Sequence, residues 1–277
     1  MLITRILTAL VLLAVLLPVL YSNNFAAFAV VASLFFGAAI WESFRLFNPG
    51  SKYAPVIAAF WTAAFAYAFF LAPSGGATTF WFAIGVLLWL LRFAPSLKLG
   101  LPPLASAANT TLSLIYAIAV VSCFAAIVTM FQHSALYLLS VMAIVWVADV
   151  FAYFSGKAFG RRKLAPSISP GKSWEGAIGG CIAVLTVATL TVLFGGEALA
   201  DTFAVRVQAG LGWPGMFAVL ILIVAASIVG DLFESQLKRR AGMKDSSNVL
   251  PGHGGVLDRI DALVPVLPLA ALIGAWL

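Results

Sequence analysis

The sequence predicts an all-α fold, a polytopic membrane bundle of about nine transmembrane helices. Hydrophobic residues make up 63% of its 277 residues and charged residues only 9%, whereas soluble domains carry about 25% charged residues. The apolar runs are continuous, without the alternation of barrel strands, and reach the roughly 20 residues that a membrane-spanning helix needs. The predicted spans are 4–22, 25–40, 54–72, 77–93, 111–131, 134–154, 176–196, 213–232 and 256–276.

The first four spans are predicted to form two helical hairpins. The first span resembles a signal peptide, but its apolar run is long and has no clear cleavage site, so we interpret it as a helix. The segments 21–24 (Tyr-Ser-Asn-Asn) and 73–76 (Pro-Ser-Gly-Gly) have the composition of tight turns. The chain is predicted to be one integral membrane domain, 1–277, with helices of unassigned role in 1–131 and catalytic helices and loops in 132–277.

The basic residues predict an orientation for this bundle. If the N-terminus is cytoplasmic and the nine spans alternate, every Lys and Arg except Arg206 falls on the cytoplasmic side, as the positive-inside rule requires. Two strongly basic loops, 155–175 and 235–255, then lie on the same face. The net charge of +6 is therefore a topology signal, and no nucleic-acid partner is expected.

The stretch 149–176 carries the first group of polar candidates. Asp149 and Tyr153 are four residues apart near the end of the sixth span, so they share a helix face. Lys172 and Ser173 follow Pro-Gly at a predicted helix start, where backbone N–H groups and a lysine can meet phosphate oxygens. The segment is not a P-loop, because Pro166 stands where the first glycine should be. The plainer interpretation is that these bases only enforce topology.

A second group of candidates runs from the end of the eighth span into the ninth. Asp231, Ser235 and Lys238 share a face if the helix continues, and Asp258 and Asp261, three apart, share another. The glycines that precede them allow a tight turn or a close approach to a ligand. His253 is either a hydrogen-bond donor to a phosphate, a proton carrier or an ordinary turn residue.

The candidate metal ligands are all carboxylate oxygens, from Asp231, Asp258, Asp261 and Asp149. Oxygen ligands without a Cys/His cluster favour Mg²⁺. Carboxylates, a divalent metal and bases together are suited to phosphoryl or nucleotidyl transfer.

These residues closely resemble the signature of the phosphatidate cytidylyltransferase family, also called CDP-diacylglycerol synthase. The resemblance covers about 149–261 and includes the stretch that begins at Asp149 and runs through Ser-Pro-Gly-Lys-Ser-Trp-Glu-Gly. The longer part of the signature is matched by Ser235, Leu237, Lys238, Arg239, Lys244, Asp245, Pro251, Gly252, His253, Gly254, Gly255, Val256, Asp258, Arg259, Ile260 and Asp261.

The resemblance implies that CTP and phosphatidate react to CDP-diacylglycerol and pyrophosphate, in a homodimer in the bacterial inner membrane with its site facing the cytoplasm. It implies metal binding by Asp231 and Asp258, with a monovalent cation such as K⁺ beside Mg²⁺ in some members. Asp261 is expected to be a further ligand or to orient Arg259. The remaining expected contacts of phosphate or substrate are Lys238, Arg239, Lys244, Lys172, Ser173, Ser235, Asp245, His253, Gly254, Gly255, Arg259, Asp149 and Tyr153.

Two other functions stay open at this point. A CTP-dependent polyprenol or dolichol-type lipid kinase would transfer the γ-phosphoryl group to a lipid alcohol, which would need an essential base. An ion-coupled transporter would carry charges near the centres of several spans, but the predicted spans in 1–131 have none there, and the acidic residues cluster near one face.

Overall fold

The computed structural model describes residues 2–22, 24–72 and 78–277, and most of that chain is helical. The predicted turn at 73–76 lies outside the described residues. The elements are the helices α1 (Leu2–Ser22), α2 (Phe25–Phe47), α3 (Ala54–Ala66), α4 (Thr78–Leu88), α5 (Ala94–Leu99), α6 (Ala107–His133), α7 (Ala135–Phe159), α8 (Trp174–Phe194), α9 (Phe203–Arg240), α10 (Leu257–Ile260) and α11 (Leu263–Gly274), the π-helical turns η1 (Tyr67–Leu71) and η2 (Trp89–Phe93), the 3-10 turn η3 (Glu197–Leu199), and the strands β1 (Lys163–Ala165) and β2 (Ser169–Ser173).

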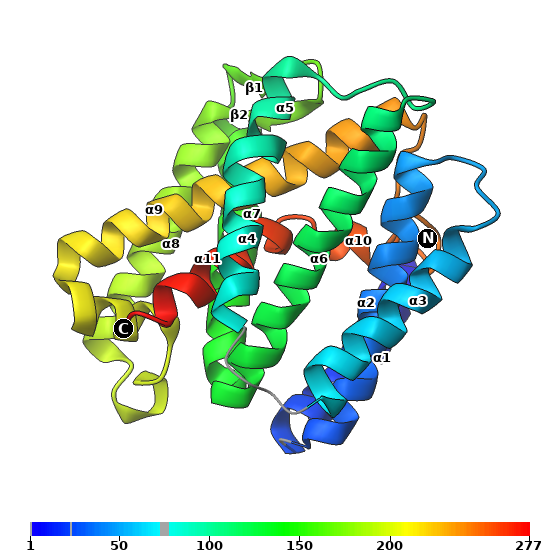
Figure 1. Ribbon diagram of the computed structural model, residues 1–277. Coiled ribbons are helices and arrows are strands. Elements are labelled where there is room, and N and C mark those ends of the chain that lie inside the picture. Colours follow the sequence, from blue (N-terminus) through cyan, green and yellow to red (C-terminus); the bar gives the residue numbers. More distant parts are fainter. Residues whose placement is uncertain (1, 23, 73–77) are drawn as a thin grey trace.

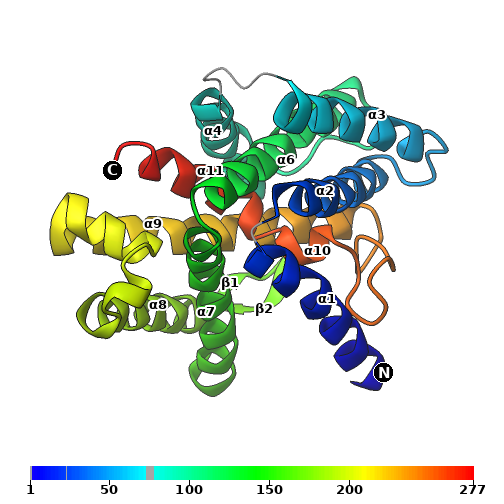
Figure 2. The ribbon, with the colours of Figure 1, turned by 90° about the horizontal axis from the view of Figure 1, so that it is seen from below.

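Seven helices in the described part of the chain are long and apolar enough to cross a membrane. They correspond to the second through eighth predicted spans, so the chain is a multi-pass membrane protein with the predicted all-α fold. The first predicted span coincides with α1. Figures 1 and 2 show the helices as a bundle in which α11 lies between α4, α6 and α9, and α6 is the most deeply buried of the seven.

The ninth predicted span, 256–276, is not a single helix. The structure divides it into α10 and α11, which has only 12 residues. Twelve residues rise about 18 Å, well short of the roughly 30 Å of a bilayer core. Leu263, Val264, Val266 and Leu267 are buried inside the bundle, so hydropathy reflects protein packing here and not exposure to lipid.

The helix α9 extends well past the predicted eighth span at both ends. The backbone is not helical at Gly212, which has a φ of 66°. Glycine adopts this positive φ at little steric cost. Pro214 follows and lies in the first turn of the next helical segment, where proline costs no hydrogen bond. The helix then continues to Arg240, and this carries Asp231, Ser235 and Lys238 on one continuous element.

A small antiparallel hairpin of β1 and β2 connects α7 to α8, where the sequence predicted only a loop. Glu175 accepts hydrogen bonds from the amides of Arg161 and Arg162 at 3.1 and 3.2 Å, which holds the base of the hairpin against α8. Ser173 is the N-cap of α8, and its hydroxyl accepts from the amide of Gly176. These local bonds fix the position of Lys172 in β2.

The helices α7 and α8 pack with their backbones close together. A Cβ atom at Gly180 would lie 2.5 Å from the carbonyl oxygen of Ala148, and one at Gly176 would lie 2.7 Å from that of Ala152. Glycine is therefore required at both positions if the two helices keep this spacing. The pair forms one wall of the cavity described below.

Segments far apart in the sequence gather at one end of the bundle, at the top of Figure 1. Asn109 donates to the carbonyl oxygen of Phe47 at 2.8 Å, Arg240 to that of Pro102 at 2.8 Å, and Arg239 to that of Ile168 at 3.5 Å. The end of α2, the loop before α6, the hairpin and the end of α9 therefore form one polar region. This grouping agrees with the predicted placement of the basic loops on a common face.

Candidate active site

An ion pair joins the two groups of polar candidates that the sequence singled out. The Lys172 ammonium on β2 lies 2.5 Å from Asp231 Oδ2 on α9. The Ser235 hydroxyl donates to Asp231 Oδ1 at 3.2 Å, as expected for residues four apart on a continuous helix. Both members of the ion pair keep about a quarter to a third of their side-chain surface exposed, so other groups can reach them.

A cavity of about 510 Å³ opens beside this ion pair, between α7, α8, α9 and the hairpin. Asp149, Lys157, Lys172 and Asp231 contribute its charged lining. The rest of the lining is small or apolar and includes Ala148, Ala152, Gly156, Gly180, Val224 and Ile228. Tyr153 and Ser173 also line it. The cavity therefore combines charged groups with a surface that suits hydrocarbon.

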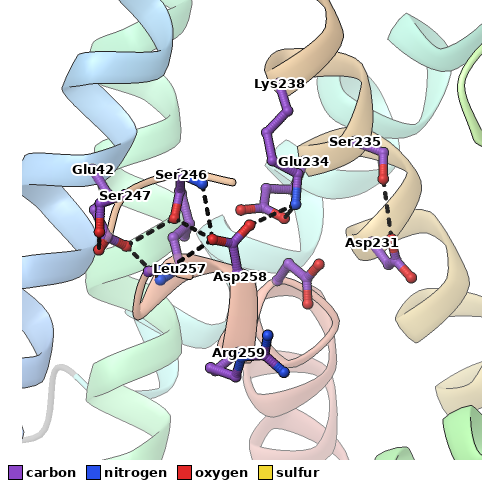
Figure 3. A network of polar contacts seen from close by, with 12 residues as sticks. Glu42, Asp231, Glu234, Ser235, Lys238, Ser246, Ser247, Leu257, Asp258 and Arg259 are labelled. Atoms are coloured by element: carbon purple, nitrogen blue, oxygen red, sulfur yellow. Dashed lines mark hydrogen bonds and ion pairs between the residues drawn. The ribbon is translucent and has the colours of Figure 1, made fainter. Parts of the chain in front are cut away.

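A second charged group lies where α9 meets α10 (Figure 3). The Lys238 ammonium lies 2.5 Å from Glu234 Oε2 and 2.7 Å from Asp258 Oδ1. Glu234 is fully buried and the Asp258 side chain is 6% exposed. Glu234 was missed by the sequence analysis, although its position four residues before Lys238 is the spacing of a helical ion pair.

Asp258 is held by more than this lysine. Its Oδ2 accepts hydrogen bonds from the amides of Ser246 and Gly255 and from the Ser246 hydroxyl, each at 2.8 Å. Burial raises the pKa of Asp258, but the Lys238 ammonium and these amide donors outweigh burial and hold the pKa below its ordinary value. Asp258 is therefore an ionised carboxylate with a fixed orientation.

Asp261 has the opposite electrostatic setting. Burial, followed by the negative charge of Asp231, raises the pKa of Asp261 well above its ordinary value. One of its oxygens accepts from the following amide, that of Ala262, at 2.8 Å. Close approach here depends on Gly230, because a Cβ at that position would lie 2.4 Å from the Asp261 carbonyl oxygen.

The most informative carboxylate in the region is Glu42, which the sequence analysis did not single out. It lies near the end of α2 and is fully buried. Its Oε1 accepts from the Ser247 hydroxyl at 2.5 Å and the Val256 amide at 3.0 Å, and its Oε2 from the Leu257 amide at 2.6 Å. A lone acidic residue next to an otherwise uncharged span was the available signal.

The other predicted residues lie around this network with fewer contacts. Lys244 and Asp245 are exposed. Arg259 is also exposed and donates from Nε and Nη2 to the carbonyl oxygen of His253, at 3.0 and 2.5 Å. His253 Nδ1 is buried and has no hydrogen-bond partner in the described chain. The described contacts therefore do not show a role for the His253 ring.

Gly254 and Gly255 are each required by the geometry. Gly254 has φ +82°, and a Cβ there would lie 2.7 Å from Asp258 Oδ2. At Gly255 it would lie 2.1 Å from the Ser246 hydroxyl oxygen and 2.5 Å from Glu42 Oε1. The glycines thus let two buried carboxylates approach the backbone of the same turn.

The carboxylates of this region differ in how well they suit a magnesium ion. In the described parts of the chain, no three His, Cys, Asp or Glu side chains are grouped closely enough for a protein-only metal site. Mg²⁺ is commonly bound by one or two carboxylates together with water and substrate phosphates. Asp231 fits that mode, because it is an oxygen ligand that is partly exposed and faces the cavity. Asp258 fits less directly, since its side chain is only 6% exposed and accepts from Ser246 and Gly255 as well as Lys238.

The sequence of this chain is similar to those of several bacterial enzymes. A protein of Haemophilus influenzae named phosphatidate cytidylyltransferase is 48% identical over 136 residues, 49% of this chain and 44% of that protein. Proteins of the same name from Pseudomonas aeruginosa and Bacillus subtilis are 50% and 37% identical, over 50% of this chain and 47% and 46% of theirs. The matched regions cover a little under half the length of these curated relatives.

The match to a protein family covers nearly the whole chain. A model of the cytidylyltransferase family matches residues 3–277 and so includes α1 to α6 as well as the charged segments. The helices in 1–131, to which the sequence assigned no role, are thus part of what the family shares. This chain belongs to the cytidylyltransferase family.

Proposed function

We propose that this chain transfers the cytidylyl group of CTP to phosphatidate and so produces CDP-diacylglycerol and pyrophosphate. The observation that carries the proposal is the cavity whose charged lining, with Lys172 and Asp231, adjoins an apolar lining on membrane-spanning helices. Such a cavity suits a substrate with a phosphate headgroup and hydrocarbon tails. The membership in the cytidylyltransferase family and the names of the relatives support the choice of CTP and phosphatidate.

The lipid enters from the side of the bundle in this proposal. The membrane-spanning helix α7 lines one side of the cavity and also carries exposed apolar side chains, including Val150, Phe151 and Phe154. The acyl chains can remain in hydrocarbon while the headgroup reaches the charged lining. Transfer of the acyl chains into water would instead cost about 0.8 kcal/mol for each CH₂ group. Lateral entry avoids this cost.

The cationic side chains hold the phosphate groups. Lys172 and Lys157 line the cavity, and Arg239 lies beside the hairpin through its contact with the Ile168 carbonyl. An oxygen of the phosphatidate phosphate attacks the α-phosphorus of CTP, and the bond from that phosphorus to the β-phosphate oxygen breaks. The attacking phosphate is already anionic near neutral pH, so no side chain has to act as a strong base.

Asp231 would hold the magnesium ion together with phosphate oxygens, and Asp258 would be the second protein ligand. A bound Mg²⁺ supplies charge neutralisation at the phosphate oxygens during transfer. Ser235, through its hydrogen bond to Asp231 Oδ1, orients that carboxylate. Lys238 keeps Asp258 ionised and in place.

The site faces the cytoplasm of the bacterial inner membrane in this proposal. The loops and helix ends that carry the basic residues gather at one end of the bundle (Figure 1). Through the positive-inside rule, this grouping supports a cytoplasmic position for that end. CTP is a cytoplasmic nucleotide, which is consistent with that side.

The test is an assay of purified protein with Mg²⁺, phosphatidate and CTP labelled at either the α- or the γ-phosphate. The proposal predicts α-label in the lipid product and γ-label in released pyrophosphate. Label from the γ-phosphate in the lipid would identify a lipid kinase instead, and no label in the lipid would reject both. Asp231→Asn should abolish the product, whereas Glu197→Gln, an exposed carboxylate in η3, should leave it unchanged.

A further inference from the structure

Glu42 connects the N-terminal half of the chain to the segment 246–257, which we call the signature loop. Apart from one bridge between Leu250 and Gly254, this loop has no regular secondary structure before α10. Its conformation therefore depends on side-chain contacts. The Glu42 carboxylate bonds both ends of the loop at once, with Ser246 and Ser247 at one end and Val256 and Leu257 at the other.

These contacts are the complete set of partners that the structure gives this carboxylate. Glu42 is fully buried, and in the described chain it forms no ion pair. A buried carboxylate without a cation is costly unless hydrogen bonds replace its hydration. Three donors from the signature loop do so here, at 2.5 to 3.0 Å, and the Ser246 hydroxyl lies 3.1 Å from Oε2. Such a carboxylate and the loop that surrounds it are mutually dependent.

One hydroxyl links this carboxylate directly to Asp258, as Figure 3 shows. The Ser246 Oγ lies 3.1 Å from Glu42 Oε2 and 2.8 Å from Asp258 Oδ2. A serine hydroxyl has one proton and so can donate to only one carboxylate at a time. The Ser246 amide donates to Asp258 as well. Any shift of the loop at this residue therefore moves two of the donors that orient Asp258.

We propose that Glu42 is a positioning residue, which holds the signature loop and thereby the Asp258 carboxylate in the geometry required for catalysis. Its catalytic consequence rests on the proposed function, but its effect on the loop does not. The proposal also gives the N-terminal helices a task, because α2 supplies a group on which the site in the C-terminal half depends. Glu42 itself need not touch a substrate.

The test uses Glu42→Gln, which preserves side-chain size but replaces one acceptor oxygen by an NH₂ group. This places donor against donor at one side of the loop. The matched control is Ser43→Ala, because Ser43 is the next residue on α2, is buried, and bonds only the Ile40 carbonyl of its own helix. Ser247→Ala is an intermediate variant, since Ser247 contacts Glu42 but not Asp258.

Two readouts are expected to change together. Residues that support metal ligands from behind typically affect activity by about 10- to 100-fold, so Glu42→Gln should lower kcat by about that factor. The KM for CTP should stay within about twofold, because the groups that bind phosphate are untouched. Amide hydrogen exchange of 245–258 should become faster in Glu42→Gln, less so in Ser247→Ala, and not in Ser43→Ala.

The inference would be overturned by unchanged kcat and unchanged exchange in Glu42→Gln. It would also be overturned if Ser43→Ala produced the same changes, because the effect would then be one of general helix packing. Hydrogen exchange keeps this test separate from the proposed function. If the wild-type protein makes no CDP-diacylglycerol, the proposed function fails, and the exchange of the signature loop still decides the part of Glu42.

Discussion

Replacing Lys238 by methionine should destabilise the protein through the carboxylates that it leaves behind. Lys238 donates a hydrogen bond to Glu234, which is fully buried. Leaving a buried charge without its partner costs about 3–5 kcal/mol. The expected loss of unfolding free energy for Lys238→Met is therefore about 3–5 kcal/mol.

A second substitution should restore much of that stability. In Lys238→Met/Glu234→Gln the orphaned buried charge is removed, and Asp258 keeps its three donors from Ser246 and Gly255. The remaining loss is then one hydrogen bond to a charged group, about 1.5–3 kcal/mol. The double variant should be more stable than Lys238→Met by roughly 2 kcal/mol, yet it should remain inactive because Asp258 lacks its cation.

The assay is unfolding in mixed micelles with a rising fraction of denaturing detergent, followed by fluorescence of the eight tryptophans. Lys98→Met is the control, because Lys98 is exposed at the same end of the bundle. A Lys238→Met protein as stable as the wild type would refute the reasoning. So would a double variant no more stable than Lys238→Met, since Glu234 would then not be the source of the loss.

Three further outcomes follow from the same contacts. Asp261 has a raised pKa, so the folded state binds a proton that the unfolded state releases, and stability should fall as pH rises above about 4, the ordinary pKa of an aspartate. Asp261→Asn, unfolded in the presence of EDTA, should flatten that decline, and an equal decline in the variant would exclude Asp261 as its source. Lys172→Gln should reduce the initial rate by about 10²–10³-fold but stability by less than about 1 kcal/mol, since its ion pair is partly exposed; a rate loss explained by unfolding would contradict this. Gly255→Ala places a methyl group 2.1 Å from the Ser246 hydroxyl and should lower the thermal midpoint, whereas Gly171→Ala meets no atom within 4 Å and should not; equal midpoints would count against the tight turn.

The spacing of polar residues along one helix predicted the local part of the site. The prediction that Asp231 and Ser235 share a face is confirmed by their hydrogen bond. The prediction that the basic segments 155–175 and 235–255 lie together is confirmed by the hydrogen bond from Arg239 to the Ile168 carbonyl oxygen. Both follow from short-range periodicity and from the alternation of membrane spans, which a sequence displays directly.

Contacts between distant segments were beyond such reasoning. Glu42 and the signature loop are more than 200 residues apart, and no local pattern says which buried acceptor will satisfy the amides of Val256 and Leu257. The same limit explains why Glu234 was missed, since the burial that makes it significant depends on helices that pack around it.

Hydropathy also fails where burial by protein replaces burial by lipid. The residues of α11 are as apolar as those of a membrane span, yet they pack against α4, α6 and α9. The average hydropathy of 256–276 is that of an apolar segment whether it forms one helix or two, so the break between α10 and α11 could not be predicted from it. The ninth predicted span is wrong because hydropathy measures how apolar a segment is. It does not tell whether the segment contacts protein or lipid.

The ion pair between Lys172 and Asp231 would also act when the products of the proposed reaction leave. The lysine and the carboxylate neutralise each other at 2.5 Å. A polyanion that takes Lys172 as its partner must compete with Asp231, and the carboxylate reclaims the lysine as the anion departs. On the proposed function, the pair would weaken the retention of pyrophosphate and so protect turnover from inhibition by this leaving group.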